Sequence, residues 1–250
     1  MSRVPRATPP ARRLAVLGAA LVGVAVLVAL VGCASGTAST PAGGASSAPA
    51  PARLEPDADP PADADPDAPL VAFYGDSYTL GTGATAREKR WSTIICTERG
   101  WTEFNPSVNG LGFINQRRDR DLPGAIIAAD PDLVIVTMGL NDNFSYTYSS
   151  DEIEAQIETD LQRLRTELPE ARIVVVEPFW YTDERPGSVP RIIDWVHASA
   201  ERIGADWIPG ASHWIEGHPE WMARDGLHPN DAGYAEIARR MDAELRAIGL

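Results

Sequence analysis

From residue 70 onward, short apolar runs alternate with segments whose apolar residues recur every three or four positions. A short apolar run predicts a buried strand, and the longer period predicts an amphipathic helix. The clearest helix is 151–168, where Ile153, Ile157 and Leu161 share one face. The predicted strands are 70–74, 101–108, 132–138, 172–176 and 205–208, and the predicted helices are 87–99, 124–129, 151–168, 188–203 and 230–248. This alternation predicts an α/β fold, a three-layer α/β/α sandwich with a central parallel sheet.

Residues 1–32 have the pattern of an export signal, with arginines and no acidic residue before an uncharged apolar run from Leu14 to Gly32. The run ends in Leu30-Val31-Gly32-Cys33, which resembles the lipobox of bacterial lipoproteins. The resemblance implies that the segment is cleaved and that Cys33 is lipidated. An uncleaved anchor is the alternative, because the run is close to the about 20 residues that span a bilayer. Both alternatives tether the chain to the extracytoplasmic face of the cell membrane.

Residues 33–69 are rich in alanine, proline, glycine and aspartate, which predicts a disordered linker followed by one domain over 70–250. The formal net charge is −13, and the segment after the arginine-rich signal is more acidic still. We therefore expect no binding to nucleic acid. With Cys33 lipidated, Cys96 has no cysteine left to pair with, and we expect it to pack as a small apolar side chain.

Polar side chains follow two of the predicted strands and precede the last helix. Asp76 and Ser77 come after strand 70–74, and Asn141 comes after strand 132–138, at the edge where open α/β sheets bind ligands. Near the end of the chain, the spacing of Asp225 and His228 lets the carboxylate reach one imidazole nitrogen within a single turn. A serine is a poor nucleophile without such a base, so the sequence predicts that Ser77 and His228 act together.

Four short motifs, in this chain order, resemble those of the SGNH (GDSL) family of serine hydrolases. They are Gly75-Asp76-Ser77, with Tyr78 where the family's short motif has leucine, then Gly110 or Gly112, then Gly139-Leu140-Asn141-Asp142, and finally Asp225 with His228. The resemblance implies a flavodoxin-like SGNH hydrolase fold and activity on ester bonds, of the carboxylesterase, lipase or deacetylase type. It implies no metal or organic cofactor.

The roles follow from the chemistry of acyl transfer together with that resemblance. Ser77 is the expected nucleophile, His228 its base, and Asp225 the carboxylate that orients His228. An oxyanion needs waiting hydrogen-bond donors, for which we expect the backbone N–H groups of Ser77 and Gly110 and the side-chain amide of Asn141. We expect Asp76 and Asp142 to hold loops by accepting hydrogen bonds from backbone N–H groups.

The substrate itself is much less constrained. Phe179, Trp180 and Tyr181 follow strand 172–176 and are a candidate substrate pocket, although core packing explains them equally well. The hypothesis is an exported, membrane-tethered serine esterase that hydrolyses esters of a lipid, an acylated glycan or a small molecule. A non-catalytic glycan- or lipid-binding lipoprotein on the same fold and an O-acyltransferase are the alternatives. The acyl chain, the alcohol and the oligomeric state stay open.

Overall fold

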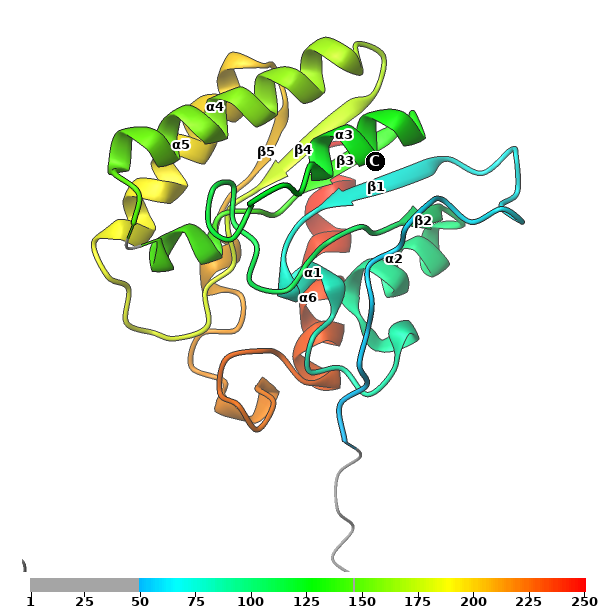
Figure 1. Cartoon of the computed structure of the whole chain (residues 1–250). Helices are drawn as coiled ribbons and strands as arrows, with labels where there is room; N and C mark the ends of the chain where they lie inside the picture. Colours follow the sequence, from blue (N-terminus) through cyan, green and yellow to red (C-terminus); the bar gives the residue numbers. More distant parts are fainter. Residues whose placement is uncertain (1–49, 146) are drawn as a thin grey trace, which may run out of the picture. The chain divides into compact units, whose positions relative to one another are not determined.

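The computed structural model describes residues 50–145 and 147–250 (Figure 1). Within these residues five strands form one sheet in the order β2-β1-β3-β4-β5, and every neighbouring pair is parallel. The strands are β1 (Leu70–Tyr74), β2 (Thr102–Phe104), β3 (Leu133–Val136), β4 (Arg172–Val176) and β5 (Asp206–Ile208). The predicted parallel sheet is therefore confirmed. The predicted export signal and Cys33 lie outside the described residues.

Helices cover both faces of this sheet, as Figure 1 shows. Helices α2 (Trp91–Arg99) and α6 (Asp231–Ala247) pack on one face, and α3 (Leu122–Ala129), α4 (Ser150–Glu167) and α5 (Ser188–Arg202) pack on the other. Side chains alternate along a strand, so Val71 and Phe73 of β1 enter the first core and Ala72 and Tyr74 enter the second. Burial on both faces explains why the strands are continuous apolar runs, and the predicted α/β/α sandwich is confirmed.

The remaining elements are short. Helix α1 (Ser77–Leu80) is a single turn separated from the end of β1 by two residues, in a stretch for which the sequence predicted neither a helix nor a strand. Four 3-10 turns lie between the helices and strands of the described chain: η1 (Arg87–Lys89), η2 (Leu140–Phe144), η3 (Ala211–His213) and η4 (Pro219–Trp221). The predicted helix 87–99 is thus a 3-10 turn followed by α2.

Strand β2 is shorter than the predicted strand 101–108. Its ladder with β1 stops after Phe104, because the Asn105 N–H donates to the Asp57 carboxylate at 2.9 Å and Pro106 has no N–H to donate. The Asn105 side chain instead donates to the Thr79 carbonyl at 2.8 Å. The chain after β2 is therefore a loop that runs along the carboxyl edge of the sheet.

Contacts of the domain begin before residue 70, which corrects the described part, residues 50–69, of the linker predicted over 33–69. The Ala52 N–H donates to the Ala84 carbonyl at 2.8 Å, and the carboxylate of Asp57 accepts from both terminal nitrogens of Arg87 at 2.6 and 2.8 Å. The reason is a buried charge: the guanidinium of Arg90 is fully buried, 3.1 Å from Glu103 and 3.7 Å from Asp57. A buried cation requires carboxylates around it, and Asp57 supplies one of them.

One further expectation concerns burial. Cys96 is buried in the core as a free thiol, as expected. Across residues 50–145 and 147–250, the structure has no helix that combines the length and the apolar character needed to cross a membrane.

Candidate active site

Ser77 begins helix α1 at the carboxyl end of β1. Asp76 precedes it as the cap of the helix, and its Oδ1 accepts a hydrogen bond from the Tyr78 N–H at 2.9 Å. The Ser77 side chain is nearly buried, and neither its hydroxyl nor its backbone N–H donates to any described residue. The first N–H groups of a helix lack partners inside the helix, so this one can bind an incoming oxygen.

Asp225 and His228 form a close pair in the loop before α6. The Asp225 Oδ2 lies 2.7 Å from the His228 Nδ1, and the Asp225 Oδ1 accepts from the backbone N–H groups of Leu227 at 2.9 Å and His228 at 3.0 Å. Partial burial raises the pKa of Asp225, but the hydrogen bonds from His228 and Leu227 outweigh it and hold the pKa below its ordinary value. An ionised Asp225 places the imidazole proton on Nδ1 and leaves Nε2 as a base.

The segment that carries Ser77 contacts the loop that carries His228. The Tyr78 hydroxyl donates to the Leu227 carbonyl at 2.7 Å, and the rings of Tyr78 and His228 have centroids 6.2 Å apart. At Gly83 a Cβ would collide with the Pro229 carbonyl oxygen, so glycine is needed for this close approach. The structure therefore brings together two regions 149 positions apart in sequence, as the paired roles of Ser77 and His228 require.

The loop after β2 offers two glycines beside the nucleophile, and their surroundings differ. The Gly112 N–H donates to the Asn115 carbonyl at 3.0 Å, and a Cβ on Gly112 would collide with the Asp142 carboxylate. The Gly110 N–H donates to no described residue. Gly110 is therefore the glycine with a donor to offer, whereas Gly112 allows the close approach of Asp142.

Asn141 lies in η2, after β3, and joins the neighbouring loops. Its Nδ2 donates to the Asp76 Oδ2 at 3.1 Å and to the Leu111 carbonyl at 3.0 Å. Both amide hydrogens of Asn141 are thus engaged, and donation to an oxyanion requires one of them to be shared between two acceptors.

Burial raises the pKa of Asp76 to about 7, although hydrogen bonds from the Tyr78 N–H and the Asn141 side chain counteract it. Near neutral pH this carboxyl group therefore changes its charge beside the donor.

These motifs and their arrangement can be compared with known proteins. Residues 73–236 match the GDSL-like Lipase/Acylhydrolase family. The chain belongs to this family. The "GDSL lipase Rv0518" of Mycobacterium tuberculosis is 29% identical over 188 residues, which cover 68% of this chain and 79% of that protein.

Solved esterases share the fold at low sequence identity. The psychrotrophic esterase EstA from Pseudoalteromonas sp., solved with monoethylphosphonate as inhibitor, is 15% identical with a TM-score of 0.57, over 71% of this chain and 97% of its own. The acetylxylan esterase Axe2 from Geobacillus stearothermophilus is 22% identical with a TM-score of 0.55, over 73% of this chain and 94% of its own. The family places this chain among ester hydrolases, and the expected SGNH-type fold is confirmed.

In this GDSL protein the carboxylate of Asp142 holds the loop that follows strand β2. Its two oxygens accept from the backbone N–H groups of Phe113 at 2.8 Å, Ile114 at 3.0 Å and Asn115 at 3.2 Å. Burial raises the pKa of Asp142 to about 6, against the lowering effect of these three hydrogen bonds. Asp76 and Asp142 thus both accept backbone N–H groups, as expected, but Asp142 fixes the loop of Gly110 rather than its own.

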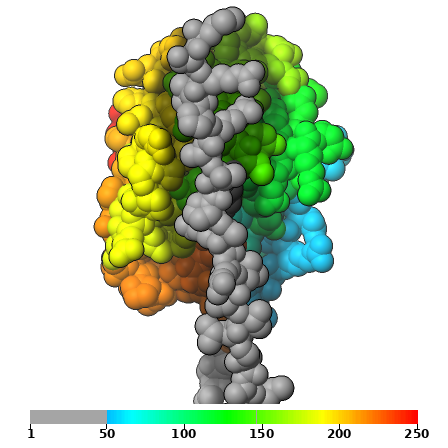
Figure 2. Space-filling view, turned by 60° about the vertical axis from the view of Figure 1, so that its left-hand side comes forward, coloured from blue at the N-terminus to red at the C-terminus, as the bar shows by residue number. Residues whose placement is uncertain are grey.

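The three candidate pocket aromatics have different environments. Phe179 and Trp180 are buried in the core, where the Phe179 ring stacks on Tyr78 with centroids 5.6 Å apart. Tyr181 is half-buried and lines a cavity of about 690 Å³ together with Asp183, Glu184, His218, Arg224 and Gly226. Figure 2 shows the surface of residues near 180–200 (yellow) directly above that of residues near 210–230 (orange). Of the three aromatics, Tyr181 alone lines this cavity.

Sequence reasoning assigned no role to Tyr78 beyond its departure from the family's leucine, and it did not single out Tyr234. The Tyr234 hydroxyl donates to the Thr82 carbonyl at 2.7 Å, which ties α6 to the segment after the nucleophile.

Among residues 50–145 and 147–250, no group of three or more metal-ligating side chains lies close enough together to hold a metal ion.

Proposed function

We propose that this protein is an exported, membrane-tethered serine esterase that hydrolyses carboxylic esters of a polar alcohol. The observation that carries the proposal is the Asp225–His228 pair at 2.7 Å, in a loop hydrogen-bonded to the residue after Ser77. A hydroxyl, an ionised carboxylate and an imidazole, in this chain order, are the parts of a nucleophilic acyl-transfer site.

The proposed reaction proceeds through an acyl-enzyme. The Ser77 Oγ attacks the ester carbonyl while the His228 Nε2 accepts its proton, and Asp225 stabilises the imidazolium that forms. The developing oxyanion accepts from the N–H groups of Ser77 and Gly110 and from the Asn141 amide. His228 then returns the proton to the leaving alcohol, and water activated by His228 hydrolyses the acyl-enzyme.

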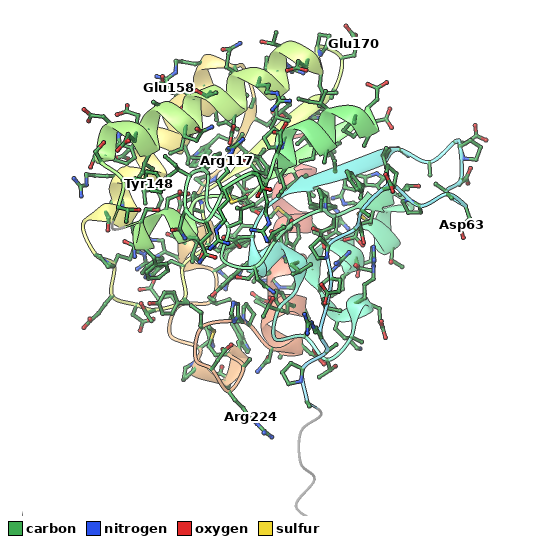
Figure 3. All side chains as sticks on the ribbon, viewed as in Figure 1. Asp63, Arg117, Tyr148, Glu158, Glu170 and Arg224 are labelled. Carbon is green, nitrogen blue, oxygen red and sulfur yellow. The ribbon has the colours of Figure 1, made fainter. Side chains whose placement is uncertain are left out.

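The alcohol must lie on the side of His228, because His228 protonates it. Residues before His228 in the same loop, among them Arg224 and Gly226, form one wall of the cavity of about 690 Å³. Neither Ser77 nor His228 lines this cavity, whose other walls carry Asp183 and Glu184 beside apolar side chains. Figure 3 shows Arg224 pointing away from the tip of this loop. These charges suit a polar, hydroxylated alcohol such as a glycan.

The described surface gives little support to a lipid substrate. Among its large hydrophobic residues only Tyr148 is strongly exposed, with 41% of its area accessible to solvent. Enzymes and modules that act on a lipid surface present a contiguous apolar patch, and scattered single residues do not form one. We therefore favour an acylated glycan or a small polar ester over a membrane lipid.

The tether rests on the sequence alone. The lipobox-like Leu30-Val31-Gly32-Cys33 supports lipidation of Cys33 after cleavage of residues 1–32. Growth with a clickable fatty acid should label the wild-type chain and leave Cys33→Ala unlabelled. Equal labelling of both chains contradicts a lipid on Cys33, and absence of label from wild type favours an uncleaved anchor.

Hydrolysis by the full-length protein tests the activity. We expect turnover of p-nitrophenyl acetate and of acetylated oligosaccharides, and its loss in Ser77→Ala, which keeps the fold because it removes one oxygen atom. Acetate release with and without an added acceptor sugar separates a hydrolase from an O-acyltransferase. Equal rates for wild type and Ser77→Ala contradict the proposal, and no turnover by wild type on any ester favours the non-catalytic binding protein.

A further inference from the structure

The side chain of Tyr78 is the point at which the nucleophile segment meets the catalytic loop. Its hydroxyl donates to the Leu227 carbonyl at 2.7 Å, and Leu227 lies between Asp225 and His228. The family's short motif has leucine at this position, and a leucine side chain cannot make this bond. The contact is therefore specific to chains with tyrosine here.

The catalytic loop has few other restraints. Asp225 is half exposed, and its hydrogen bonds to Leu227 and His228 lie within the loop itself. Across the described residues, the Tyr78 hydroxyl provides the single hydrogen bond from another element to residues 225–228. Within the loop, the His228 carbonyl accepts from the Ala223 N–H at 2.8 Å. Anchors to other elements resume at Asn230, whose N–H donates to the Trp221 carbonyl at 2.8 Å, and at Asp231, whose carboxylate accepts from Thr85.

Tyr78 is itself held rigidly. It is fully buried, and its ring stacks on Phe179 with an interplanar angle of 20°. Phe179 in turn packs on Trp91 and Trp214. Burial also raises the pKa of Tyr78 well above its ordinary value, so the hydroxyl keeps its proton and remains a donor throughout the working range.

We propose that Tyr78 is a positioning residue that sets the place of His228 relative to Ser77 through the Leu227 carbonyl. The proposal rests on the proposed esterase function. Tyr78 follows Ser77 directly in the same helical turn, so one rigid unit carries the nucleophile and the anchor of its base. Tyr78 acts on the alignment of the base and makes no contact required for substrate binding.

This role predicts a specific kinetic signature. A misplacement of about 1 Å in a catalytic group can cost about 100-fold in rate, and loss of one hydrogen bond permits part of such a shift. We expect Tyr78→Phe to lower kcat about 10-fold while KM stays within about twofold. Tyr78→Leu, which restores the family's residue, also loses the bond and should lower kcat at least as much.

The matched control is Tyr74→Phe. Tyr74 is equally buried, and its hydroxyl donates to Asp160 at 2.6 Å in the core on the opposite face of the sheet. Its removal should lower stability as much as Tyr78→Phe does and leave kcat within about twofold. A fall in kcat of the same size in both variants would mean that general stability, not positioning, is responsible.

The closing experiment measures kcat and KM of the full-length wild type and the three variants, together with amide hydrogen exchange of the peptide that contains residues 225–228. We expect Tyr78→Phe to speed exchange there about two- to tenfold and Tyr74→Phe to leave it unchanged. Wild-type kcat or unchanged exchange in Tyr78→Phe overturns the proposal. A wild type inactive on every ester refutes the proposed function instead, and the exchange rates then still report whether Tyr78 anchors the loop.

Discussion

Replacing Asp142 with asparagine should raise the stability relative to wild type as pH rises from 4 to 7, and should lower kcat. Asp142 is ionised at neutral pH yet buried, which raises its pKa from 3.8 to about 6. The folded state therefore holds the proton more tightly than the unfolded state, and stability from this group is present at low pH and lost as pH rises from about 4 to 6. The shift corresponds to about 3 kcal/mol over the whole window, of which about 2 kcal/mol fall between pH 4 and pH 7.

Asparagine has no charge to bury, so the variant escapes this loss. Between pH 4 and pH 7 the wild type should lose about 2 kcal/mol of unfolding free energy from this group, and Asp142→Asn should not. The unfolding free energy of the variant minus that of the wild type, measured by urea denaturation, should therefore be about 2 kcal/mol higher at pH 7 than at pH 4. Asp121→Asn is the control of opposite sign, because the hydrogen bond from Arg163 chiefly lowers the pKa of Asp121. That variant should lose stability relative to wild type over the same pH range.

The kcat of Asp142→Asn, in contrast, should fall. Asparagine replaces one acceptor oxygen by an NH₂ group that faces the backbone N–H groups of residues 113–115. The loop then releases Gly110, and loss of one oxyanion donor costs about 100-fold in kcat or more. If kcat is unchanged, Asp142 does not hold the donor loop. If the difference in unfolding free energy between the variant and the wild type is the same at pH 4 and pH 7, burial does not raise the pKa of Asp142.

Three further variants test other parts of the structure. Asn141→Ala should lower kcat by about 10² to 10³, in ester hydrolysis assays, if the amide reaches the oxyanion. Asp57→Asn should lower the free energy of unfolding by about 2 kcal/mol because it weakens the partners of buried Arg90; no change in urea denaturation would mean that residues 50–69 do not pack. Gly83→Ala, whose methyl group meets the Pro229 carbonyl, should displace the catalytic loop and lower kcat about 10-fold, with little change expected from the exposed control Gly187→Ala.

The sequence predicted the sheet well because its strands are buried on both faces. A strand such as β3 is a continuous apolar run, and α4 has a clear helical period. Helix α1 was missed because four residues carry no period. Strand β2 was predicted too long because its end depends on Asp57, a residue far away in sequence. The same carboxylate explains the packing of 50–69, since composition alone does not reveal a buried arginine that needs a partner.

Contacts in the site between residues close in sequence could be predicted, whereas contacts between residues far apart in sequence could not. Asp225 and His228 are three residues apart, so their pairing follows from local geometry. The choice between Gly110 and Gly112 depends on which N–H has a partner, and only the folded loop decides that. The contact of Tyr78 with Leu227 joins positions that no local spacing relates.

The most direct test of the central claim is the rate at which a fluorophosphonate modifies the chain. The account predicts one covalent adduct, mapped to Ser77 by peptide mass spectrometry, and a rate lower by about 10⁴-fold or more in His228→Ala, because the serine loses its base. An adduct on another residue, or an equal rate of modification in His228→Ala, would contradict a nucleophile activated by the Asp225–His228 pair.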